Sequence, residues 1–187
     1  MRKALFILGE LNDTDVEWMI NYGRRKRLPV GSVLIREGGS TDALFILLDG
    51  TVAISIKTVG NGAGERVLYQ RSTGEIMGEV SFVDARPPTA TVKAQDEVLV
   101  LAIPREILQA KLLVDAGFAS RFYRAVALTL SYRLREVMDQ LAAGQDTAGN
   151  KASVSDEDEL DLEVMDKVYL AGQRFERILK RLSGEGA

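Results

Sequence analysis

The sequence predicts a mainly β protein with flanking helices. Three observations support this fold class. Between Pro29 and Pro104, short segments rich in Val, Ile, Leu and Thr are separated by glycine-containing turns, as in a sandwich or rolled barrel. After Pro104, apolar residues recur every three or four positions, which is typical of helices. A polar stretch then separates the helical region from one last amphipathic segment. We therefore expect a double-stranded β-helix (a jelly roll or β-roll), a long helix after it, and a separate terminal amphipathic helix.

An N-terminal helical segment is expected over residues 1–27. Its helix covers 13–22, where Asp13 or Thr14 can cap the start and Gly23 suits the end. The basic run RRKR at 24–27 follows. We interpret it as four solvated cations, which are favoured after a helix C-terminus; a patch for phosphate or anionic lipid is the alternative.

The β-roll is expected over 28–104. The Asp49-Gly50 pair is a strong hairpin signal, because an apolar run precedes it and an alternating segment follows it. Turns are also expected at Gly38-Gly39 and Asn61-Gly62. The expected strands are 33–36, 43–48, 51–58, 66–71, 90–94 and 98–103.

Two helices are expected over 105–141. Pro104 suits the first turn of a helix over 105–113. A longer helix over 118–141 carries an apolar stripe made of Phe118, Phe122, Val126, Leu130, Leu134, Val137 and Leu141. At 1.5 Å per residue this stripe is about 36 Å long, which exceeds the width of one small roll. We therefore predict a homodimer through Phe118 to Leu141, although the stripe can instead pack on its own roll.

The remaining residues form a linker and a terminal amphipathic helix. Small and polar residues without apolar periodicity predict a linker over 142–159. The terminal segment, 160–187, carries one apolar face that about 20 residues cannot bury alone. It must dock on the roll, on a second subunit, or on another protein, and we expect a partner protein of unknown identity.

Composition excludes several function classes. The 187 residues include no Cys and no His, so the commonest general base and transition-metal ligand are absent, and we expect no metal and no enzymatic activity. A net charge of −3 argues against a nucleic-acid binder. No apolar run has membrane-spanning length, so we expect a cytoplasmic protein without membrane contact.

The segment from Gly78 to Ala94, GEVSFVDARPPTATVKA, carries the candidate site. Backbone N–H groups at the start of a short helix or nest favour an anion. A glutamate can accept hydrogen bonds from ribose hydroxyls, and threonine hydroxyls can donate to phosphate oxygens. Such a site usually also contains an arginine fork directed at the phosphate.

This segment resembles the phosphate-binding cassette (here 76–92) of the cyclic-nucleotide-binding domain family, and the resemblance extends over about 28–141. It implies that Glu79 binds the ribose hydroxyl. It also implies that the N–H groups near Gly78, Val80 and Ser81 face the phosphate, and that Thr89 and Ala90 adjoin it. The family's arginine aligns with Pro88, so Arg86, two positions earlier, is the nearest substitute.

The resemblance implies a non-enzymatic sensor that binds cyclic AMP or cyclic GMP weakly and signals through its helices to a partner. An interaction or assembly protein that keeps the fold without the ligand is the alternative. A transcription regulator of this fold would need a second helix presented to DNA with cations around it, and the tail offers one helix preceded by acids.

Overall fold

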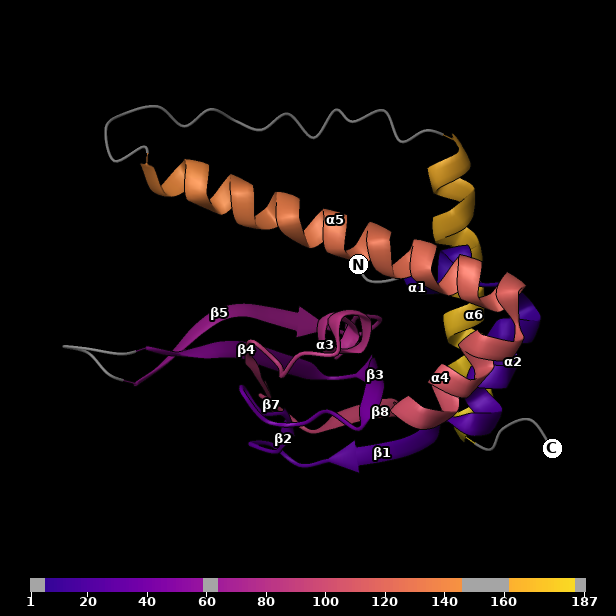
Figure 1. Ribbon diagram of the computed structural model, residues 1–187, viewed down its shortest axis with the longest axis horizontal. Coiled ribbons are helices and arrows are strands. Elements are labelled where there is room, and N and C mark those ends of the chain that lie inside the picture. The colour runs from indigo at the N-terminus through magenta and orange to yellow at the C-terminus, as the bar shows by residue number, and fades with distance from the viewer. Residues whose placement is uncertain (1–5, 59–63, 146–161, 184–187) are drawn as a thin grey trace.

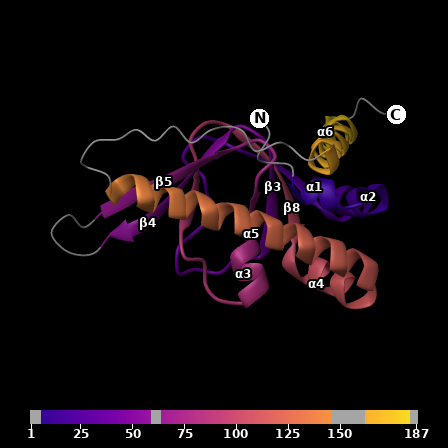
Figure 2. The same ribbon diagram turned by 90° about the horizontal axis from the view of Figure 1, so that it is seen from above.

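The computed structural model describes residues 6–58, 64–145 and 162–183. Two four-stranded antiparallel sheets form the β-roll, and four helices, α1, α2, α4 and α6, gather at one end of it (Figure 1). The long helix α5 runs from this end across the roll, above β4 and β5 (Figures 1 and 2). The predicted fold class is confirmed. The expected Asn61-Gly62 turn and residues 146–159 of the expected linker lie outside the described residues.

The strand order is β1-β8-β3-β6 in one sheet and β2-β7-β4-β5 in the other. The first sheet contains β1 (Arg24–Leu28), β3 (Ala43–Asp49), β6 (Ile76–Met77) and β8 (Val98–Pro104). The second contains β2 (Val33–Ile35), β4 (Thr51–Thr58), β5 (Gly64–Ser72) and β7 (Thr91–Ala94). Gly50 has φ +88° and turns the chain from β3 to β4, so the Asp-Gly pair correctly predicts a turn. The predicted hairpin is wrong, because β3 and β4 belong to different sheets and do not pair with each other.

The helices are α1 (Phe6–Glu10), α2 (Asp13–Tyr22), α3 (Glu79–Asp84), α4 (Arg105–Val114), α5 (Ala116–Gln145) and α6 (Leu162–Ser183). Asn12, rather than Asp13 or Thr14, caps α2 in a capping box with Asp15. The long helix extends four residues beyond the predicted end, so residues 142–145 are helical and not linker.

Strand β3 separates two hydrophobic cores. Phe45 and Leu47 point into the roll, whereas Leu44 and Ile46 pack against the helices at its end. Both faces of β3 are therefore buried, which explains why its sequence is a continuous apolar run without alternation.

The basic run RRKR is solvated, as we expected, but no strand was expected there and the run forms most of edge strand β1. Arg24 to Leu28 pair with β8 in antiparallel register, and this pairing satisfies the backbone groups on the side of β1 that faces β8. The four cationic side chains remain exposed. Charged side chains are a common protection of an edge strand against unwanted pairing.

The apolar stripe of α5 divides into two parts. Phe118, Phe122 and Val126 are buried in the core at the end of the roll, so this part of the stripe packs within the chain. Further along, Leu134 and Leu141 are 62% and 60% exposed. The predicted dimer contact through this second part stays a prediction.

Helix α6 packs on α1 and α2 of the same chain. Its Ala171 and Ile178 are buried, and Arg174 donates hydrogen bonds to Asp13 Oδ1 at 2.9 Å and to the Leu8 carbonyl at 2.8 Å. The chain's own N-terminal helices, which were not among the three docking surfaces that we expected, therefore cover part of the apolar face. The predicted partner protein stays a prediction. No helix among the described residues is long and apolar enough to cross a membrane.

Candidate ligand-binding cassette

A left-handed glycine begins the cassette. Gly78 has φ +89° and links β6 to α3. A Cβ atom at this position would lie 3.1 Å from the Ala43 carbonyl oxygen, so the turn has neither the backbone conformation nor the space for a side chain. Helix α3 ends after six residues at Ala85, which is also left-handed with φ 56°. Arg86, Pro87 and Pro88 then lead to β7.

Glu79 begins α3 and is 2% exposed. Its carboxylate forms an ion pair with Arg133, which α5 places over the cassette. The same guanidinium donates to Glu75 Oε2 at 3.0 Å and to the Ile76 carbonyl at 2.7 Å. Burial by itself lowers the pKa of Arg133, but the attraction of Glu79 and Glu75 outweighs it and raises this pKa above its ordinary value. Helix α5 is thus joined to the cassette through a buried cation.

A second guanidinium lies beside the first. Arg71, at the end of β5, is 9% exposed and pairs with Glu136 of α5 at 2.8 Å, with Glu75 farther away at 3.9 Å. Neither Arg71 Nε nor Arg133 Nε has a hydrogen-bond partner. We call Arg71, Arg133, Glu75, Glu79 and Glu136 the Arg–Glu cluster. It holds two positive and three negative charges. Both guanidiniums are therefore already paired with carboxylates, and neither has an unpaired positive charge for an anion.

A cavity of about 470 Å³ lies between the second sheet, the cassette and α5. Six of the seven predicted site residues line it, namely Gly78, Glu79, Val80, Ser81, Thr89 and Ala90, together with Pro88. Arg71 and Arg133 also line it. The seventh predicted residue, Arg86, is exposed and is not among the lining residues; its N–H donates to Asp84 Oδ1 at 3.0 Å.

Neighbouring loops hold the cassette in place. The carbonyl of Pro88 accepts a hydrogen bond from Gly38 N–H at 2.8 Å, and Thr91 Oγ1 accepts one from Glu37 N–H at 3.2 Å. On the other side, Arg105 Nη1 donates to the Ser81 carbonyl at 2.9 Å, and its guanidinium lies 5.4 Å from the centre of the Phe82 ring. The cassette is therefore anchored to the loop that follows β2 and to the start of α4.

Sequence reasoning missed the cations of this site. Arg133 lies three residues after Leu130 and four before Val137, so it interrupts the apolar face of the long helix, and that interruption was a usable signal. Arg71 lies just before the cassette and Glu136 lies on the long helix after the roll, and neither belongs to the cassette motif.

Comparison with known proteins agrees with this geometry. The model of the "Cyclic nucleotide-binding domain" family matches residues 25–115. A cAMP-dependent protein kinase regulatory subunit from Blastocladiella emersonii is 27% identical over 120 residues, which are 64% of this chain but only 29% of that protein.

Two solved structures are also similar. The N-terminal domain of a transcriptional regulator from Streptomyces coelicolor A3(2) is 30% identical, with a TM-score of 0.58 over 72% of this chain and 91% of that one. A cyclic nucleotide-binding domain from Methylobacillus flagellatus is 22% identical, with a TM-score of 0.67 over 80% of this chain and 85% of that one. The family model, the sheet topology and the cassette cavity agree that residues 25–115 form a β-roll of the cyclic nucleotide-binding type.

Proposed function

We propose that this protein is a non-enzymatic regulatory module in which occupancy of the cassette cavity controls the position of α5. The observation that carries the proposal is the ion pair between Glu79, buried in the cassette, and Arg133 on α5. The relatives support it, since they include a kinase regulatory subunit and the N-terminal domain of a transcriptional regulator.

The mechanism is a population shift. A ligand that hydrogen-bonds to Glu79 competes with Arg133 for the same carboxylate, so it loosens one of the contacts that hold α5 over the cavity. The helix continues for 12 residues beyond Arg133 to Gln145, and its exposed leucines move with it. Those leucines are the proposed contact with a second copy of the chain or with a partner protein.

Cyclic AMP and cyclic GMP are expected to bind weakly. The resemblance to the family aligns its phosphate-binding arginine with Pro88, which is buried and has no charge. A charged hydrogen bond contributes about 1.5–3 kcal/mol, so a missing two-pronged contact weakens binding by roughly 10²–10⁴-fold. The Arg–Glu cluster does not replace it, because carboxylates already pair with both of its guanidiniums.

The second candidate function is nucleotide-independent interaction or assembly. The pairing in the cluster favours it, since the two guanidiniums that line this cavity are already neutralised by carboxylates. The helices alone would then carry the role of the protein.

Isothermal titration with both cyclic nucleotides tests the proposal on the intact protein. The Pro88→Arg variant should bind 10²–10⁴-fold more tightly than the wild type, for the energetic reason given above. Pro87→Arg is the matched control, because it adds the same charge at the exposed neighbouring position, which does not line the cavity. Adding Glu79→Gln to the Pro88→Arg variant should remove most of the gain in nucleotide affinity. Equal affinities for the two arginine variants would support the nucleotide-independent function instead.

A further inference from the structure

The wall of the cavity is mostly aliphatic. Strands β4 and β5 contribute Ile54, Ile56 and Leu68, and α5 contributes Leu130, Leu134 and Val137. A cavity of about 470 Å³ falls within the range of roughly 300–1,000 Å³ that is usual for small-molecule sites. Apolar surface of this kind favours an apolar occupant over water.

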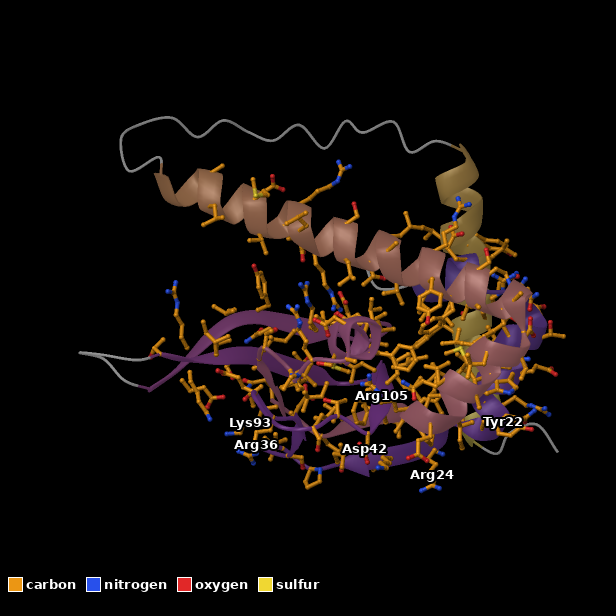
Figure 3. All side chains as sticks on the ribbon, viewed as in Figure 1. Tyr22, Arg24, Arg36, Asp42, Lys93 and Arg105 are labelled. Atoms are coloured by element: carbon orange, nitrogen blue, oxygen red, sulfur yellow. The ribbon has the colours of Figure 1, made fainter. Side chains whose placement is uncertain are left out.

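The charges around the cavity disfavour an anion. Both lining guanidiniums are paired within the Arg–Glu cluster, so their charges are already neutralised by carboxylates, of which Glu79 also lines the cavity. Two other cations of the roll, Arg36 and Lys93, lie on the side of the roll opposite α5 (Figure 3). Neither of them lines the cavity.

We propose that the cavity binds a neutral, mainly apolar small molecule rather than a charged nucleotide. The aliphatic wall holds the body of such a ligand. One polar group of the ligand can hydrogen-bond to the hydroxyls of Ser81 or Thr89, which line the cassette end of the cavity. This inference rests on the proposed role of the cavity as a ligand site and names the chemical class of the ligand.

Two fluorescent probes with the same skeleton test the charge preference. N-phenyl-1-naphthylamine is neutral, and 1-anilinonaphthalene-8-sulfonate adds one sulfonate to that skeleton. We expect saturable binding of one neutral probe per chain, at least tenfold tighter than binding of the sulfonate. The Glu136→Gln variant removes one negative charge beside Arg71, so the preference for the neutral probe should become smaller.

Two tryptophan variants locate the binding. Leu68→Trp places a larger side chain in the cavity and should lower the affinity for the neutral probe at least tenfold. Val67→Trp is the control, because Val67 is the neighbouring residue on β5, is exposed, and does not line the cavity. Equal affinity for the two probes, or equal binding by the two tryptophan variants, would overturn the proposal.

Hydrogen exchange separates this inference from the proposed function. With the neutral probe bound, amide exchange in α5 after Arg133 should change. One outcome is that the neutral probe binds saturably, that Leu68→Trp removes this binding, and that amide exchange in α5 does not change. This outcome would support the ligand class and contradict the regulatory coupling. Absence of saturable binding of the neutral probe would contradict the ligand class only, because the coupling can still be measured with cyclic AMP on the Pro88→Arg variant.

Discussion

Replacing Arg133 by methionine should destabilise the protein and release α5 from the cassette. Methionine keeps a long unbranched side chain but removes the guanidinium. The loss comprises ion pairs with Glu79 and Glu75 and the hydrogen bond to the Ile76 carbonyl. Removing one partner of a buried ion pair costs about 3–5 kcal/mol. Since the Arg133 side chain is 18% exposed, some solvent reaches the remaining carboxylates, and we expect a loss of about 2–4 kcal/mol.

Urea unfolding followed by circular dichroism measures this loss as a change in the free energy of unfolding. Arg135→Met is the matched control, because Arg135 is exposed on the same helix, and its substitution should change stability by less than about 0.5 kcal/mol.

A double-mutant cycle with Glu79→Gln isolates the ion pair. Residues in direct contact usually show a coupling free energy of about 0.5–3 kcal/mol, and we expect a value in the upper half of that range for this buried pair. A coupling near zero, or an Arg133→Met variant as stable as the Arg135→Met control, would refute the view that this pair holds α5 on the cassette.

Other substitutions test the remaining contacts. Ile178→Ala, in the buried face of α6, should cost about 2–4 kcal/mol and increase amide exchange in α6, whereas Tyr169→Ala on its exposed side should do neither. Asp13→Asn should destabilise the docking of α6 by less than about 1 kcal/mol, because this carboxylate is half exposed. Hydrogen bonds from two arginines of α6 lower the pKa of Asp13, so its contribution to stability is present above its unfolded pKa and is lost as the pH falls through the folded value; chemical unfolding from pH 7 to pH 2 checks this. Leu141→Glu should shift a dimer to a monomer in sedimentation, and an unchanged mass would count against the helix-mediated contact. Gly78→Ala should destabilise by about 1–3 kcal/mol in urea unfolding, owing to the left-handed backbone conformation.

Much of the cassette was predictable because its geometry is local. The Gly-Glu pair determines a left-handed turn followed by a short helix, and both features arise within a few residues. Six of the seven predicted residues line one cavity for the same reason. Arg86 does not join them, because the chain after Ala85 leaves the helix and directs that residue to solvent.

Strand β1 shows where local signals were insufficient. Four consecutive cations have low strand propensity, so no strand was predicted for this run. Pairing with the buried strand β8 overrides this preference, because the backbone groups of β8 need partners on that edge and the side chains of β1 can remain in water.

The sequence by itself determined the β-roll, the position of the Gly-Glu turn and the long helix, because hydrophobic periodicity and turn chemistry act over a few neighbouring residues. Only the tertiary structure decided that Arg133, 54 residues after Glu79, neutralises it, and that α6 packs on the first two helices. Electrostatic pairing and apolar burial depend on distance in space. No local pattern specifies which distant cation will reach a buried carboxylate once the chain has folded.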